Sequence, residues 1–142
     1  MVLSEFTNGT FGRRPASALR FGLVWQAVGW AMVALVIWLS LTPHPPQPPA
    51  LLSWDKADHL LAYAALMFWY AQSFARHWRW PLFLCLLGFA LEVLQGLSAF
   101  RTFDLYDMVA NLLGVALGLV LAMTPLGNML TVVDRLLAAR IA

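Results

Sequence analysis

Long apolar runs without a single charged residue are the feature that most limits what this chain can fold into. No charge occurs between Phe21 and Leu41, and none occurs between Met108 and Val133. A helix needs about 20 predominantly apolar residues to cross the hydrocarbon core of a bilayer. Hydrophobic residues make up 61% of the chain and charged residues 11%, against about 25% charged in an average soluble domain. The sequence therefore predicts an all-α integral membrane protein.

Four spans of this length account for most of the 142 residues and leave no room for a separate soluble domain. The segment 42–50 contains five prolines and must end the first span, because proline lacks the amide hydrogen that a helix requires. One four-helix transmembrane domain is thus expected over residues 20–127. Its spans are predicted at about 21–41, 57–75, 81–98 and 105–125.

Basic residues predict how these spans are oriented. Seven of the nine Lys and Arg residues fall on one side of the predicted spans: Arg13, Arg14, Arg20, Arg76, Arg79, Arg135 and Arg140. Because cytoplasmic loops are enriched in Lys and Arg, we expect both termini in the cytoplasm, as an arm over residues 1–19 and a short interfacial helix within 128–142. The net charge of +2 is too small and scattered to predict a nucleic-acid partner. Membrane lipids are the expected contacts.

Glu92 is the most informative single residue, because it lies inside a predicted span. A carboxylate there is costly to insert, and such residues usually mark a functional site. At 100° per residue, Gln95 shares the helix face of Glu92. The last predicted span has a matching polar face, and its small residues at four-residue spacing are typical of packed membrane helices. That face carries Asp104, Asp107, Asn111, Gly114 and Gly118.

The second predicted span completes this polar region. Asp55, Asp58, His59 and Tyr63 follow one another at helical spacing and share one face. Three spans therefore present polar residues near the same end of the bundle. We expect an inward-facing pocket that opens to the extracytoplasmic side.

These residues resemble the VanZ-like family of small bacterial multipass membrane proteins. The resemblance covers about half of the chain. It rests on three segments: Asp55-Lys56-Ala57-Asp58-His59 followed by Tyr63; Glu92-Val-Leu-Gln95; and Arg101-Thr-Phe-Asp104 followed by Asp107, Asn111, Gly114 and Gly118. The family pattern often has a proline before the arginine, where this chain has Phe100.

The resemblance implies a multipass protein of the bacterial inner membrane. The founding member of the family is associated with resistance to the glycopeptide antibiotic teicoplanin, and a broader grouping suggests enzymes that act on lipid head groups. One hypothesis is therefore a protein that acts on phosphate-containing lipid or cell-envelope head groups, including a lipid-linked envelope precursor. The candidate catalytic residues are His59, Glu92 and Asp107. The candidate substrate-binding residues are Asp55, Gln95, Arg101 and Asn111.

The alternative hypothesis is a non-catalytic binding or accessory subunit that recognises a lipid, a membrane protein partner or an antibiotic, and so acts as a glycopeptide-antibiotic tolerance factor. It is favoured by the absence from the sequence of a Gly-x-Ser-x-Gly elbow and a His-Glu-x-x-His zinc helix. The sequence also leaves undecided whether the site holds a metal cofactor. Oxygen-rich sites suit magnesium or calcium, but the acids can equally be titrating groups without a metal.

Several of these residues also have a purely structural interpretation. Asp104 is well placed to cap the last helix, and Gln95 and Asn111 are suited to hydrogen bonds between helices. Glu92 requires a partner if it is a structural group, and His59 or Arg101 would supply one.

Overall fold

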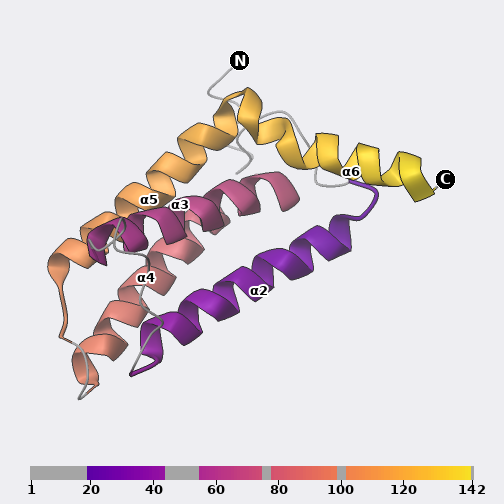
Figure 1. Ribbon diagram of the computed structural model, residues 1–142. Coiled ribbons are helices and arrows are strands. Elements are labelled where there is room, and N and C mark those ends of the chain that lie inside the picture. The colour runs from indigo at the N-terminus through magenta and orange to yellow at the C-terminus, as the bar shows by residue number, and fades with distance from the viewer. Residues whose placement is uncertain (1–18, 44–54, 75–77, 99–101, 142) are drawn as a thin grey trace.

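The computed structural model describes residues 19–43, 55–74, 78–98 and 102–141. Within these ranges the chain is helical and contains no β-strand. The helices, shown in Figure 1, are α2 (Gly22–Leu41), α3 (Asp55–Ser73), α4 (Arg79–Leu97), α5 (Leu105–Met123), the short 3₁₀ helix η3 (Pro125–Asn128) and α6 (Met129–Ile141). The predicted all-α class is confirmed, and each expected span coincides with a helix to within two residues at either end.

The helix ends follow from the local sequence. Asp104 is the N-cap of α5, and its carboxylate accepts a hydrogen bond of 2.8 Å from the backbone N–H of Tyr106. This is the capping role that its position predicted. At the other end of α5, the hydroxyl of Thr124 accepts from the N–H of Leu126, and Pro125 begins η3. The chain thereby turns from α5 into α6.

Helices α2 to α5 run in alternating directions, so that the amino-terminal ends of α3 and α5 lie beside the carboxyl-terminal ends of α2 and α4 (Figure 1). We call this end of the bundle the polar end. Helix α6 leaves the opposite end at an angle to α5, and we call that end the α6 end.

Small residues bring α3 and α5 into close contact, as their spacing predicted. A Cβ atom added at Gly114 would collide with the backbone oxygen of Leu60, and one added at Gly118 would collide with the backbone oxygen of Ala64. Only a residue without a side chain allows the two backbones to approach this closely. This packing holds the polar faces of α3 and α5 against each other.

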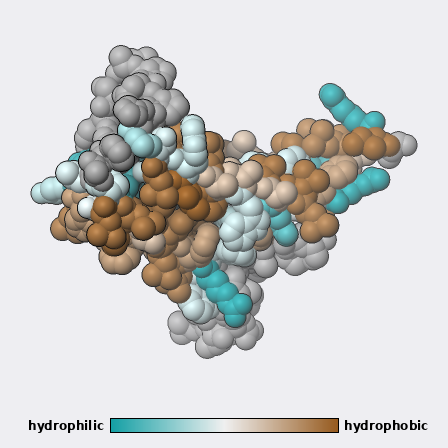
Figure 2. Space-filling model, turned by 90° about the horizontal axis from the view of Figure 1, so that it is seen from below, coloured by the Kyte–Doolittle hydropathy of each residue, from teal (hydrophilic) through white to brown (hydrophobic). Residues whose placement is uncertain are grey.

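Three described helices, α2, α4 and α5, are long and apolar enough to cross a membrane. They expose large apolar side chains, among them Leu23, Trp38, Leu86, Phe89, Leu113 and Val120. Figure 2 shows broad hydrophobic patches on one face of the molecule. In contact with lipid, such surfaces need no further protein partner.

Helix α3 is different, because it lies in the interior of the bundle. Leu61 is the one exposed large hydrophobic residue that its described part contributes. Its buried hydrophobic residues are Tyr63, Ala64, Leu66, Met67, Tyr70 and Ala71. Helix α3 carries Lys56 and Asp58 in its first turn, and both are partly buried by the surrounding protein.

Aromatic side chains fill the α6 end between α2, α3 and α4. The ring of Tyr70 stacks on that of Phe74 with centroids 4.6 Å apart, and Trp80 lies 4.5 Å from Phe74. Trp30 meets Tyr70 and Phe83 edge-on. The two ends of the bundle therefore have different interiors, one aromatic and one polar.

Candidate functional site

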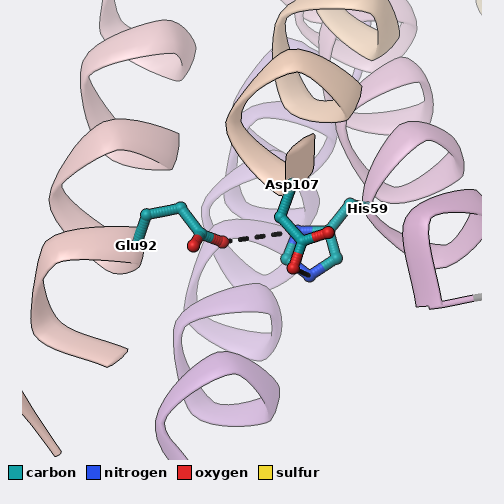
Figure 3. Close-up of side chains that lie close together, drawn as sticks. All are labelled: His59, Glu92 and Asp107. Carbon is teal, nitrogen blue, oxygen red and sulfur yellow. Dashed lines mark ion pairs between the residues drawn. The ribbon is translucent and has the colours of Figure 1, made fainter. Parts of the chain in front are cut away.

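Three predicted catalytic residues meet at the polar end, each supplied by a different helix. His59 comes from α3, Glu92 from α4 and Asp107 from α5, and their side chains point toward one another (Figure 3). Glu92 Oε1 lies 4.0 Å from His59 Nδ1, and Asp107 Oδ2 lies 3.7 Å from His59 Nε2. The imidazole ring is thus placed between two carboxylates. We call these three residues the His–Glu–Asp cluster.

Glu92 is the deepest member of the cluster, with 1% of its surface exposed. It precedes the end of α4 at Leu97 by five residues, which is about 8 Å along a helix. Its Oε2 accepts a hydrogen bond of 3.3 Å from the backbone N–H of Asp104. Among the described residues, no hydrogen-bond partner reaches Oε1. A buried carboxylate oxygen without a donor is unfavourable, and Oε1 is the one carboxylate oxygen in this state among the described residues.

His59 is oriented by Asn111 of α5. Its Nδ1 lies 3.0 Å from Asn111 Oδ1. Because an amide oxygen can only accept, this hydrogen bond places a proton on Nδ1. The Nε2 atom is then the one directed toward Asp107. The predicted polar face of α5 therefore contributes both a carboxylate and an amide to the imidazole.

Lys56 forms ion pairs with two acids beside the His–Glu–Asp cluster, a role that the sequence did not predict. Its Nζ lies 2.7 Å from Asp104 Oδ2 and 3.0 Å from Asp107 Oδ1. The hydrogen bond from Lys56, helped by that from the Tyr106 N–H, holds the pKa of the Asp104 carboxyl below its usual range. The signal was present in the spacing, since Lys56 precedes His59 by three positions and so shares its helix face.

The predicted substrate-binding residues have different outcomes. Asn111 is buried beside His59, as described above. Gln95 is buried too, but its Nε2 donates a hydrogen bond of 2.9 Å to the backbone oxygen of Ser40 in α2. This is the hydrogen bond between helices that its structural interpretation describes. Arg101 and the side chain of Asp55 lie outside the described part of the chain.

A second buried carboxylate, Asp134 of α6, lies at the α6 end and is 2% exposed. It accepts hydrogen bonds from the backbone N–H groups of Arg20 and Phe21 at 2.7 and 3.0 Å, and from Trp25 Nε1 at 2.7 Å. Burial opposes its ionisation, but these donors outweigh burial and leave the pKa of Asp134 below its usual value. Its carboxylate thus caps the first turn of α2, where the helix dipole favours a negative charge.

Asp134 was expected only as a polar residue of an interfacial helix. The sequence places it more than a hundred residues from its donors, so local pattern carries no signal of this contact.

The His–Glu–Asp cluster is also compact enough to hold a cation. One possible donor atom from each of His59, Glu92 and Asp107 lies within 4.8 Å of the other two. Among the described residues, this is the group whose spacing would suit a metal ion. The arrangement combines one imidazole with two carboxylates.

Comparison with known proteins leaves the site to be interpreted from its own chemistry: no protein-family model, curated protein or solved structure matches the chain.

Proposed function

We propose that this chain is a VanZ-like protein of the bacterial inner membrane in which α3 also crosses the bilayer. At 19 residues α3 is as long as α4 and α5. Its limited hydropathy is compatible with a span because it is enclosed by the other helices and needs little apolar surface. The distribution of Lys and Arg supports a topology with both termini in the cytoplasm.

In this topology α6 lies along the cytoplasmic surface of the membrane. Its exposed residues are of two kinds, apolar Leu136 and Ile141 and basic Arg135 and Arg140. A helix with both kinds is suited to the boundary between lipid and water. The polar end then faces the extracytoplasmic side.

At that side the protein acts on phosphate-containing lipid or cell-envelope head groups. The observation that carries this proposal is the buried Oε1 of Glu92, which has no hydrogen-bond partner among the described residues and lies 4.0 Å from the His59 ring. A protein does not gain stability from such a carboxylate in a membrane helix, and residues of this kind are characteristic of functional sites. In the proposed topology, lipid head groups of the outer leaflet lie beside this end of the bundle.

The residues of the polar end have different proposed roles, which follow from the chemistry of their side chains. His59, Glu92 and Asp107 are the groups that act on the head group, since imidazole and carboxylate can exchange protons with it or bind a cation. Asn111 is a positioning residue for His59. Lys56 and Arg101 are proposed to supply positive charge for a phosphate. Gln95 packs α4 against α2 and is not assigned to the substrate.

The test is turnover by purified protein in nanodiscs that contain phospholipid and a lipid-linked envelope precursor, with release or transfer of the head group measured. Glu92→Gln and Asp107→Asn should each lower turnover by about 100-fold or more, the usual contribution of such groups. Asp134→Asn is the matched control, because it also neutralises a buried carboxylate and should keep its activity. Full activity in both cluster variants would contradict the catalytic role.

Lipid analysis of cells with and without the gene separates an enzyme from an accessory subunit. A changed distribution of head groups supports the proposal. An unchanged distribution together with stable copurification of a membrane protein would assign the pocket to binding instead.

A further inference from the structure

We infer that His59, Glu92 and Asp107 form a binding site for one divalent metal ion of the zinc class. The donor atoms are His59 Nε2, Glu92 Oε1 and Asp107 Oδ2. The inference deepens the proposed function by naming a cofactor for the same pocket, but ion binding is measurable without any substrate.

The first argument is that each of the three residues has one polar atom occupied and one left for a ligand. Glu92 Oε2 accepts from the Asp104 N–H, and Oε1 has no described partner in spite of being buried. Asp107 Oδ1 is bound by Lys56, and Oδ2 faces the imidazole. His59 Nδ1 is bound to Asn111, and Nε2 faces Asp107. Figure 3 shows the three side chains pointing toward one another, and one possible donor atom from each lies within 4.8 Å of the other two.

Residues that use one polar atom for a protein hydrogen bond and leave the other for a ligand are characteristic of metal sites. A histidine that binds a metal through one ring nitrogen usually donates its other N–H to an oxygen acceptor, which fixes the tautomer and the ring orientation. Here Asn111 Oδ1 is that acceptor, at 3.0 Å. With the proton on Nδ1, a neutral imidazole presents a lone pair at Nε2 toward the lone pairs of Asp107 Oδ2, 3.7 Å away. A cation between these two atoms turns a repulsive contact into two favourable ones.

The second argument is charge. Glu92, Asp107 and Asp104 bring three negative charges to the polar end, and Lys56 bound to two of them brings one positive charge. With His59 neutral, this described group has an excess of two negative charges. Glu92 and Asp107 are buried, whereas Asp104 and Lys56 are partly exposed, and an excess of one sign at the buried groups is unfavourable in a medium of low polarity. One divalent ion would balance the excess.

The third argument concerns the kind of ion. Donors that bind zinc tetrahedrally, at about 2.0–2.2 Å from the ion, lie roughly 3.4 Å apart. The observed 3.7 Å between Nε2 and Oδ2 is close to this spacing, and a possible donor atom of Glu92 lies within 4.8 Å of a donor atom of each of the other two residues. Imidazole nitrogen suits zinc and similar transition metals better than it suits magnesium or calcium. Three protein ligands leave a fourth position for water or a phosphate oxygen, as in catalytic zinc sites.

The experiment measures Zn²⁺ binding to the full chain, stripped of metal with a chelator and placed in phosphatidylcholine nanodiscs. An affinity tag without histidine avoids a false site. Equilibrium dialysis with elemental analysis should give one tightly bound Zn²⁺ per chain. Glu92→Gln, Asp107→Asn and His59→Gln should each weaken binding by tenfold or more, and Asn111→Leu should weaken it less because it removes only the acceptor that orients His59. Asp134→Asn is the matched control and should bind Zn²⁺ like the unaltered protein.

Co²⁺ provides a second readout that does not depend on any single variant. Bound at this site, Co²⁺ should give visible absorption bands of a low-coordinate ion with a nitrogen ligand, and His59→Gln should shift them. Absence of saturable Zn²⁺ binding would overturn the inference, as would binding that Glu92→Gln leaves unchanged or Mg²⁺ binding as tight as that of Zn²⁺. Head-group turnover without bound metal would overturn the metal site and leave the proposed function standing. Metal binding without head-group turnover would leave the metal site standing and overturn the proposed function.

Discussion

The two buried carboxylates of this protein lie at opposite ends of the bundle and have opposite surroundings. Asp134 accepts three short hydrogen bonds, from two backbone N–H groups and an indole. Glu92 accepts a single long one, at 3.3 Å, and its other oxygen has no described partner. Both are almost fully buried, at 2% and 1% exposure. Burial alone therefore does not distinguish these two carboxylates, whereas their sets of hydrogen-bond donors do.

The difference has a physical cause. Asp134 meets the free N–H groups at the start of α2, so the fold itself provides its counter-charge. Glu92 meets an imidazole and another acid, neither of which satisfies it in the absence of a proton or a cation. Asp134 joins α6 to α2, while Glu92 is the residue that we propose binds an ion.

Asp134→Ala should cause the largest loss of stability, about 3 kcal/mol, because it leaves two backbone N–H groups and the Trp25 indole without an acceptor in a buried place. Unfolding in detergent, followed by circular dichroism, measures this. A loss no greater than that of Glu92→Gln would contradict the contrast between the two ends.

The second largest expected effect is a loss of stability at low pH, where protonation weakens the hydrogen bonds to Asp134. Its pKa in the folded protein is lower than its ordinary value, so the contact stabilises the fold above about pH 4, the usual pKa of aspartate, and this contribution is lost as the pH falls through the lower folded value. Unfolding measured from pH 6 down to pH 2 should show a smaller loss of stability for Asp134→Asn than for the unaltered protein. Parallel curves for the two proteins would show that Asp134 has no such role.

Glu92→Gln should change stability by less than about 1 kcal/mol and is expected to increase it, because an amide is less costly than a carboxylate inside a membrane helix. The same unfolding assay serves here, with metal removed by a chelator. A large destabilisation of the metal-free protein would assign Glu92 to the structure, as Asp134 is assigned.

Gln95→Met should have the smallest effect, a loss of about 0.6 kcal/mol, which is the average for a hydrogen bond between membrane helices. It removes the contact of Gln95 with Ser40 and keeps the volume of the side chain. Zn²⁺ affinity and head-group turnover should stay unchanged. A tenfold loss of either would return Gln95 to the substrate-binding residues.

The fold at the level of single helices was predictable because it depends on local pattern. The two charge-free runs located α2 and α5, and Thr42, Asp104 and Pro125 mark the ends of these helices. The shared face of Asp107, Asn111, Gly114 and Gly118 predicted that α5 would turn its polar side inward, and all four residues are buried. The meeting of His59, Glu92 and Asp107 followed from three such faces at one end of the bundle.

What the sequence did not predict depends on pairing between distant segments. Gln95 shares a helix face with Glu92 but binds Ser40 of α2, because a face of about 100° touches more than one neighbour. Lys56 was noted only as part of the segment that resembles the family, although it bridges Asp104 and Asp107. The donors of Asp134 come from the start of the first helix, and no periodicity within α6 points to them.

The central claim, that Glu92 and its neighbours are built to bind an ion whereas Asp134 is built to hold the fold, is tested most directly by anomalous diffraction at the zinc absorption edge. Crystals of the full chain grown with Zn²⁺ should show one peak between His59, Glu92 and Asp107 and none at Asp134. Ordered side chains at the polar end with no peak between them, or an equal peak at Asp134, would contradict it.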